Sequence, residues 1–518
     1  MHKRFWNYLW FTVVIMIVFV LFSCSSYHIK SGASEGNISE LEGAVIIQPN
    51  MKDTNAEILA TNLPEYDVSV IFGLNFGKAI ASTDLSTFVK LIKSDTSENL
   101  EIQVYLSDDK KTLFIKPIFR FIPGSSEVIT NGLKPGYAYR IVVSRYLKFL
   151  DGSILGYDYF YDFKTKDLDY GIYWCASDGR AEKFIAGRKN SYFDPTKPSV
   201  IYIHGWQKDT TLRDYFREYP YFIITSSVKN IDTGRFWINK GFNIGVFFWN
   251  QFADESEVKD AEAKIWFYNN GYKNMRYRLY DGSYKDFALP KSVGDLAFEE
   301  FVKNFSNYNG SEIRIVGHSL GNQLATLLTY KVHQAIKSGQ LPQNVMPKRL
   351  VLLDPFWSKY GKSYLGGKTT SEISSNYVRE MIEQRGLAVE MYKSSMLGGY
   401  LVGDENAAMK SIVAFYRLWP DFIALNPVEQ HGYAVVWYFW SMAGLVNGYG
   451  YKFGAATSAD SVKAMMNWDW SKNLPLSKDK LKMWYTEGDG NKTPTPLDDY
   501  FVLKSGVSTW NDEIDTNY

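Results

Sequence analysis

Residues 312–325 read EIRIVGHSLGNQLA. The β-branched run 313–316 predicts a buried strand, and residues 323–337 carry the apolar periodicity of a helix. The turn between them spells Gly-x-Ser-x-Gly, and a Cβ at either glycine would crowd the strand and the helix. A strand, this pentapeptide and a helix in that order form a nucleophile elbow, which exposes a serine hydroxyl above a sheet. The stretch therefore predicts an α/β sheet with Ser319 as its nucleophile.

A second copy of the same pattern occurs near the N-terminus, at Gly32, Ser34 and Gly36. It lies in a polar segment rich in serine and glycine, with no strand before it and no helix after it. An elbow needs both elements. The context therefore favours Ser319 and gives Ser34 no catalytic role.

Length and composition indicate a globular protein of more than one domain. The chain has 518 residues, of which 46% are hydrophobic and 22% charged, and this length exceeds that of one ordinary domain. The formal net charge of +1 argues against nucleic acid as a partner. Aromatic residues reach 16%, which is typical of an aromatic-packed, β-rich core.

The N-terminus carries the pattern of an export signal. A basic start at residues 2–4 precedes an apolar stretch and the sequence Leu-Phe-Ser-Cys, in which the cysteine is Cys24. This ending resembles a bacterial lipobox, although Phe22 is bulkier than usual, and the alternative is an uncleaved single-span anchor. We predict an exported bacterial lipoprotein, lipid-anchored through Cys24 at the outer membrane or cell surface. Cys175 then has no intrachain partner.

Four regions follow from the changes in pattern along the chain. We predict a signal peptide over 1–23, a flexible tether over 24–43, a β-sandwich over 44–168 and a catalytic domain over 169–518. The sandwich is indicated by short alternating runs, expected as strands at 68–72, 100–105, 112–115 and 139–143. Residues 70–76, 113–117, 136–144, 150–152 and 161–165 resemble the bacterial Ig-like domains of exported proteins, and this resemblance implies a spacer module without catalytic residues.

The catalytic region alternates apolar strands with amphipathic helices, as α/β folds do. Strands are expected at 199–204, 243–249, 349–353 and 386–392, with a helix over 290–305. Parallel strands that carry active groups at their carboxyl ends form a doubly wound sheet. The predicted fold is thus an all-β Ig-like sandwich followed by an α/β-hydrolase with a mostly parallel sheet.

The serine needs a base, and six histidines limit the choice. In the α/β-hydrolase chain order the acid and then the histidine follow the serine. This order excludes the four histidines before Ser319, and His333 lies on the helix that leaves the elbow. His431 remains as the candidate base, in a loop expected over 426–433 before a helix over 434–442.

The chain order and the ends of the predicted strands also suggest candidates for the acid and for the oxyanion donors. Asp354 lies at the end of the strand after the nucleophile helix and is the best-placed acid, while Asp404 and Asp421 are competitors in later loops. An oxyanion hole needs two N–H groups. One is that of Leu320, and the loop after the early strand supplies the other at Trp206.

These residues carry a wider resemblance over about 172–505. The stretches 190–206, 315–325, 350–355, 431–438 and 498–505 resemble the catalytic domain of the pancreatic-type neutral lipases and their phospholipase relatives. The resemblance implies a triad of Ser319, Asp354 and His431, with oxyanion donors at Trp206 and Leu320. The chain departs from the family in having no disulfides and in the bulky Phe356 and Trp357 after the acid.

The sequence predicts a serine carboxylic-ester hydrolase, most simply a lipase acting on acylglycerols through an acyl-enzyme. A phospholipase A-type enzyme or a short-chain esterase is the alternative, and an adhesin or lipid-binding protein with a vestigial hydrolase domain is the alternative from another class. Residues 400–419 could form a lid or an ordinary helical excursion. No cofactor and no metal site are expected, although the sequence leaves a structural calcium open, and the expected partners are a lipid or ester substrate and a membrane.

Overall fold

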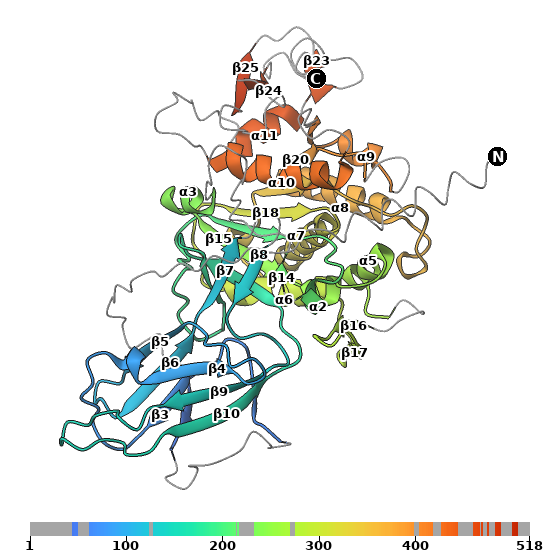
Figure 1. Ribbon diagram of the computed structural model, residues 1–518. Helices are drawn as coiled ribbons and strands as arrows, with labels where there is room; N and C mark the ends of the chain where they lie inside the picture. Colours follow the sequence, from blue (N-terminus) through green and yellow to red (C-terminus); the bar gives the residue numbers. More distant parts are fainter. Residues whose placement is uncertain are drawn as a thin grey trace. The chain divides into compact units, whose positions relative to one another are not determined.

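The computed structural model describes residues 44–49, 62–123, 128–213, 215–216, 233–269, 275–397, 403–417, 426–443, 459–466, 468–469, 474–475, 482–487 and 500–505 (Figure 1). The predicted signal peptide, the tether, Cys24 and the motif at Ser34 lie outside these residues. Within them, no helix combines the length and the apolar character needed to cross a membrane.

The N-terminal part of the described chain is rich in β-strands and forms two four-stranded sheets. One has the order β1-β3-β6-β5 and the other the order β2-β10-β9-β4. Strand β9 alternates between buried and partly exposed residues, because one face of its sheet covers a core that contains Phe72, Ile141 and Phe163. The strands are β1 Val45–Ile47, β2 Glu65–Tyr66, β3 Phe72–Asn75, β4 Val89–Lys93, β5 Ile102–Leu106, β6 Thr112–Pro117, β9 Ala138–Val143 and β10 Tyr159–Thr165.

The strand predicted at 68–72 is wrong, since β3 begins only at Phe72. The preceding residues form a turn around Asp67. Its side chain accepts hydrogen bonds from the N–H and the hydroxyl of Ser69, at 3.0 and 2.6 Å, and its carbonyl accepts from the N–H of Val70. An aspartate two residues before a serine offers the backbone this local alternative to a strand.

A hairpin from the predicted sandwich range belongs instead to the large sheet. Strand β7 (Phe119–Pro123) pairs antiparallel with β12 (Arg180–Lys183), and β8 (Val128–Asn131) pairs with β14 (Tyr215–Phe216). The two strands thus precede the predicted boundary at residue 168 but complete the sheet that follows it. The likeness to Ig-like domains and the exact domain limits stay predictions.

The large sheet has eleven strands in the described residues, in the order β14-β8-β7-β12-β11-β15-β13-β18-β19-β20-β21. Within the segment β15-β13-β18-β19-β20-β21 every adjacent pair is parallel, whereas β15 pairs antiparallel with β11 on its other side. Several are buried along their whole length because helices cover both faces of this part of the sheet. The strands are β11 Gly171–Cys175, β13 Ser199–Ile203, β15 Asn243–Phe248, β18 Ile313–His318, β19 Arg349–Leu353, β20 Ala388–Lys393 and β21 Ala414–Arg417.

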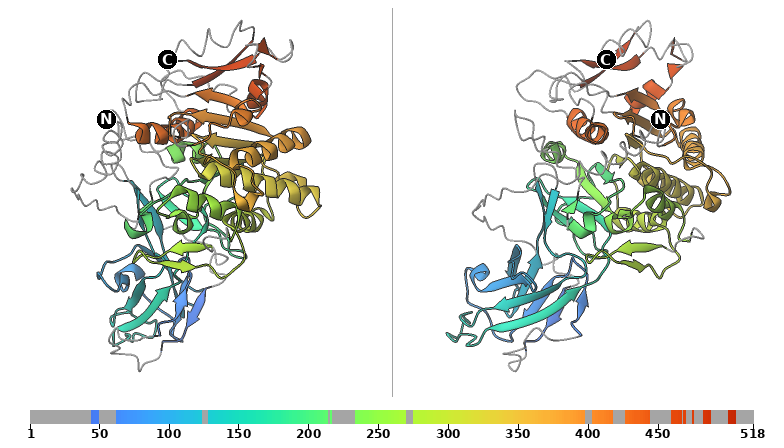
Figure 2. Two further views of the ribbon diagram at one scale, coloured as in Figure 1. Left: turned by 90° about the vertical axis from the view of Figure 1, so that its right-hand side faces the viewer. Right: turned by 45° about the vertical axis from the view of Figure 1, so that its right-hand side comes forward.

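The helices lie in two groups. Helices α5 (Val258–Trp266), α6 (Val293–Phe305), α7 (Gly321–Lys337) and α8 (Thr370–Arg385) pack on one another, and α7 also packs on β18. Helices α3 (Thr233–Asn239) and α10 (Pro427–Ala443) pack together, and α10 contacts β19 and β20 from the other side of the sheet (Figure 2). The remaining elements are α2 Thr210–Arg213, α4 Asn250–Ala253, α9 Ala407–Lys410, α11 Ala459–Met466, β16 Arg276–Arg278, β17 Tyr284–Asp286, β22 Trp468–Asp469, β23 Leu474–Pro475, β24 Lys482–Glu487 and β25 Tyr500–Ser505.

Candidate active site

The turn between β18 and α7 has the strained backbone of an elbow. Ser319 has a φ of 53°, in the left-handed region that residues with a side chain rarely adopt. Its N–H donates to the carbonyl of Leu353 at 3.0 Å, and its own carbonyl accepts from the N–H of Phe356 at 3.1 Å. Strain of this kind costs about 1–3 kcal/mol and persists only where the surroundings fix it. Here β19 and the loop after it supply those bonds.

The two glycines of the elbow are required by close backbone contacts. A Cβ on Gly317 would lie 2.5 Å from the Cα of Asn322 at the start of α7. A Cβ on Gly321 would lie 2.3 Å from the carbonyl oxygen of His204 and 2.4 Å from that of Ile203. The elbow therefore touches the end of β13, and the steric reason predicted for both glycines is confirmed.

Gly321→Ala is expected to lower the free energy of unfolding by about 1–3 kcal/mol, because the new methyl group meets two backbone carbonyls that cannot rotate away. Urea unfolding monitored by circular dichroism measures the change. Gly432→Ala is the matched control: a Cβ there meets nothing within 4 Å, and alanine favours a helix by about 1 kcal/mol over glycine. A Gly321→Ala variant as stable as the wild type would contradict this contact.

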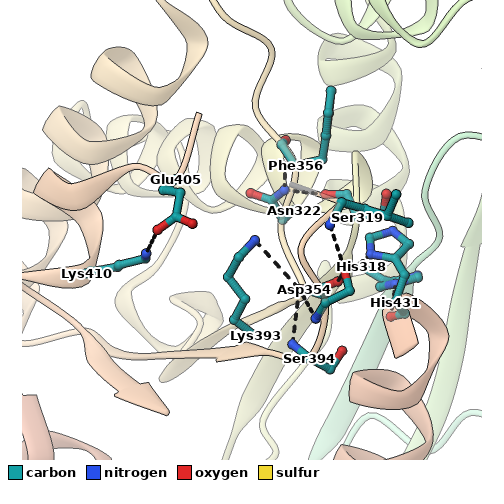
Figure 3. Close-up of polar contacts among 12 residues, drawn as sticks. His318, Ser319, Asn322, Asp354, Phe356, Lys393, Ser394, Glu405, Lys410 and His431 are labelled. Atoms are coloured by element: carbon teal, nitrogen blue, oxygen red, sulfur yellow. Dashed lines mark hydrogen bonds and ion pairs between the residues drawn. The ribbon is translucent and has the colours of Figure 1, made fainter. Parts of the chain in front are cut away.

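The predicted acid, Asp354, follows β19 and is fully buried. Its Oδ2 lies 2.5 Å from His431 Nδ1 and also accepts from the hydroxyl of Ser395 (Figure 3). Its Oδ1 accepts from the N–H groups of Ser394 and Ser395 at 3.1 and 3.3 Å. The Nζ of Lys393 lies 3.8 Å from the same Oδ1. Both oxygens of the carboxylate are therefore held in place.

This environment keeps Asp354 ionised. Burial alone would raise its pKa, but the charge and hydrogen bond of His431, followed by Lys393 and Ser395, outweigh burial and hold the pKa below its ordinary value of 3.8. Because the pKa is lower in the folded chain than in the unfolded one, the ionised group contributes stability above the unfolded pKa. That contribution is lost as the pH falls through the folded pKa.

One of the two competing acids, Asp404, bonds to other partners. Asp404 accepts from the hydroxyl of Ser371 at 2.5 Å and from the N–H of Asn406 at 2.8 Å, so it joins the start of α8 to that of α9. Asp421 lies outside the described residues. Among the three aspartates that we considered, the structure brings Asp354 to His431.

The predicted base, His431, lies within α10 rather than in a loop, so the loop expected over 426–433 is wrong. Asn426 begins the helix: its Oδ1 accepts from the N–H of Glu429, and its Nδ2 donates to the carboxylate of Glu429, each at 3.2 Å. Pro427 takes the first helical position. An Asn-Pro-x-Glu sequence is a helix start signal that could have placed this boundary from the sequence alone.

His431 is linked to the elbow through His318, the residue before Ser319. Its Nε2 donates to the carbonyl of His431 at 3.1 Å, and the two ring centroids are 4.6 Å apart (Figure 3). Among the described side chains, no hydrogen bond joins Ser319 to His431. Catalytic bonds of this type are often long in a ligand-free enzyme and tighten when substrate binds.

Helix α10, which carries His431, is hydrogen-bonded to β18, the strand that precedes Ser319. Arg314, on β18, donates from Nη1 to the hydroxyl of Tyr438 at 3.0 Å. Tyr438 lies two helical turns after His431 on α10, and both members of the bond are buried. Arg314 is also paired with Glu312 at 2.8 Å, which balances its charge. This bond ties α10 to β18 below the site.

The loop after β13 passes beside Ser319 at Gly205. The N–H of Trp249 donates to His204 Nε2 at 3.2 Å, so the proton of this imidazole is on Nδ1, which donates to the carbonyl of Gly205 at 3.0 Å. The C=O of Gly205 and the N–H of Trp206 belong to one trans peptide unit, in which they point in opposite directions. Because this C=O faces His204, the Trp206 N–H points away from His204. A Cβ on Gly205 would lie 2.8 Å from that of Ser319.

Buried charges hold this loop. The indole N–H of Trp206 donates to the carbonyl of Glu255 at 2.8 Å. The Glu255 side chain is buried and paired with Arg276 at 2.6 Å and Lys264 at 2.7 Å. Leu320 immediately precedes α7, so its N–H is among those that a helix leaves without an intrahelical partner. Both predicted oxyanion donors thus flank the elbow, and their role remains a proposal.

Sequence reasoning missed the group around Asp354 at the end of β20, which consists of Lys393, Ser394 and Ser395. Their position in the sequence could have predicted this contact. These residues directly follow a predicted strand, and its carboxyl end lies at the same edge of the sheet as Asp354. The described residues contain no group of three or more histidine, cysteine or acidic side chains arranged to hold a metal ion. Of the possible lid, residues 403–417 form α9 and β21, and β21 pairs with β20 as part of the sheet.

No protein-family model matches the sequence, and no curated protein matches it. Similar solved structures include hydrolases. A thermostable esterase is similar over 71% of this chain and 92% of its own, at 13% identity and a TM-score of 0.27. The acylaminoacyl peptidase of Pyrococcus horikoshii is similar over 68% of this chain and 65% of its own, at 11% identity and a TM-score of 0.26.

Other similar structures match a smaller share of this chain. Escherichia coli alpha-2-macroglobulin is similar over 21% of this chain, at 17% identity and a TM-score of 0.16, and the match spans 6% of its length. At these scores the fold assignment rests on the chain itself. A β-rich N-terminal region precedes a mixed sheet, in which Ser319, Asp354 and His431 follow one another in the α/β-hydrolase order. The prediction of a mostly parallel sheet is wrong, because the strands from β14 to β11 in the sheet order pair antiparallel.

Proposed function

We propose that this chain is a serine carboxylic-ester hydrolase with Ser319 as nucleophile, Asp354 as acid and His431 as base. The observation that carries the proposal is the contact between His431 Nδ1 and Asp354 Oδ2 beside the strained turn of Ser319. A buried carboxylate on Nδ1 fixes the tautomer that leaves Nε2 free to take a proton. An aspartate that only caps a turn at the end of a strand would not need a histidine as its partner.

The reaction would proceed through an acyl-enzyme. Ser319 Oγ attacks the ester carbonyl as its proton passes to His431 Nε2, and the imidazolium is stabilised by Asp354. The oxyanion that forms is placed to accept from the N–H groups of Trp206 and Leu320, and the loss of one such donor typically costs about 3 kcal/mol. His431 then protonates the leaving alcohol, and water attacks the acyl-enzyme by the same steps in reverse.

Acylglycerols are the proposed substrates. The resemblance to pancreatic-type lipases supports them, as do two exposed apolar side chains close in sequence to Ser395 and His431. Met396 follows Ser395 and is 52% exposed, and Val428 lies one turn before His431 and is 70% exposed. Such residues suit an ester with an apolar acyl chain. A phospholipid or a short ester would be hydrolysed by the same mechanism. The preference of the enzyme for acyl-chain length and head group therefore distinguishes the alternatives.

A fluorophosphonate probe tests the proposal, because it reacts with serines that an adjacent base activates. We expect one adduct, mapped by mass spectrometry to the peptide that contains Ser319. Hydrolysis of trioctanoylglycerol emulsions, phosphatidylcholine vesicles and nitrophenyl butyrate by the same preparation then ranks the three substrate classes. A folded protein that never reacts with the probe would point to the adhesin or lipid-binding alternative.

The proposed setting is outside the cytoplasm, on a membrane. The sequence before residue 24 and the thiol of Cys24 support a lipoprotein whose catalytic domain is tethered by residues 24–43. Metabolic labelling with a palmitate analogue tests the anchor. Labelling that persists in Cys24→Ala would reject it.

A further inference from the structure

Lys393 is an unusual neighbour for the acid of a catalytic triad. It is the last residue of β20, one place beyond Tyr392, which pairs with Leu353 next to Asp354. Its side chain is only 3% exposed, although lysine normally reaches water at a strand end. The Nζ instead lies 3.8 Å from Asp354 Oδ1 (Figure 3).

The two oxygens of Asp354 face different partners. Oδ2 contacts the base, His431, at 2.5 Å. Oδ1 faces the ammonium of Lys393 and two backbone N–H groups. At 3.8 Å the ammonium is an ionic neighbour rather than a close hydrogen-bond donor, so it acts on the carboxylate mainly through its charge. The carboxylate therefore lies between the ammonium of Lys393 and a group that becomes a cation during catalysis.

The charges around this pair come from several elements. Lys393 faces it from β20, and His318 from β18 contacts the carbonyl of His431. Glu429 lies in the first turn of α10 at an exposed position. Lys410 on α9 is paired with Glu405 and balanced by it (Figure 3). Among the described side chains in ionic contact with Asp354, Lys393 is the lysine and His431 the histidine.

We propose that Lys393 is a positioning residue of the triad, whose buried charge restrains Asp354 and opposes protonation of His431, so that the base stays neutral and active at lower pH. A positive charge near a histidine disfavours its charged form. Without Lys393, the full charge of Asp354 acts on His431, and the imidazolium becomes more stable. This inference rests on the proposed function, since it assigns a role relative to the nucleophile and the base.

The rate of fluorophosphonate labelling of Ser319, measured between pH 4 and pH 9, tests the inference without knowledge of the natural substrate. The midpoint of the acidic limb reports protonation of the base. Lys393→Gln is expected to raise this midpoint by about one pH unit. Lys393→Arg, which keeps the charge, is expected to leave the midpoint near the wild-type value. Nitrophenyl butyrate hydrolysis over the same range should show the same order.

Lys410→Gln is the matched control, because it removes one lysine charge that is paired with Glu405 rather than with Asp354, and we expect no shift. If Lys393→Gln does not fold, Lys393→Met, which keeps the apolar stem, carries the same test. Equal midpoints in the wild type and the neutral variants would overturn the inference, as would equal shifts in the Gln and Arg variants. A wild type that is never labelled would overturn the proposed function itself, and the role of Lys393 with it.

Discussion

Ser319→Ala is expected to lower kcat for nitrophenyl ester hydrolysis by at least about 10⁴-fold while leaving the fold intact. The loss is large because the hydroxyl supplies the bond that forms in the first step, and removal of a triad nucleophile typically costs about 10⁶-fold in kcat. The side chain is small and bears none of the backbone bonds to Leu353 and Phe356 that hold the elbow. The thermal unfolding midpoint should therefore change little.

The chain supplies its own matched control for this substitution. Ser34→Ala alters the same Gly-x-Ser-x-Gly pattern at the N-terminal copy and is expected to keep full activity. Full activity in Ser319→Ala, or a loss of equal size in Ser34→Ala, would contradict the assignment of the nucleophile. Circular dichroism of both variants separates loss of chemistry from loss of structure.

The sequence was sufficient to predict most of the strands and helices around the site, although not the start of α10. Strands such as β19 (Arg349–Leu353) are buried on both faces of the sheet. In the sequence this burial appears as a run of apolar residues without the alternation of a half-exposed strand. The chain order of the α/β-hydrolases then selected Asp354 and His431, and the structure places these two side chains in contact. Local pattern and known order were enough for these predictions.

What sequence reasoning missed depends on contacts between distant residues or on weak local signals. Lys393 reads as an ordinary polar residue at a strand end, and only the register of β20 on β19 brings it to Asp354. The contact between Arg314 and Tyr438 joins residues 124 positions apart. The start of α10 differs from the prediction for a local reason, because Asn426 caps a helix where the sequence predicts a loop.

Phe121→Asp is expected to destabilise the hydrolase by at least about 4 kcal/mol, although residue 121 lies in the range that we predicted as a separate spacer. The side chain is 1% exposed, and its ring centroid lies 5.7 Å from that of Phe248 on β15. Loss of a buried phenylalanine costs about 3–5 kcal/mol, and an unpaired carboxylate in its place adds to the loss. Thermal unfolding, together with the labelling of Ser319, measures the effect.

The neighbouring position is the matched control. Ile122→Asp introduces the same charge on the same strand at a side chain that is 42% exposed, and it is expected to be tolerated. The contrast follows from the alternation of a strand, in which one face packs on the sheet and the other meets water. If Phe121→Asp were as stable as Ile122→Asp, β7 would be dispensable to the sheet.

The expected contrast instead makes the hairpin of β7 and β8 part of the same folding unit as the large sheet. Strand β7 pairs with β12, and its Phe119 packs on Tyr173 with ring centroids 4.9 Å apart. A chain that began at residue 169 would then lack both strands and should fail to fold.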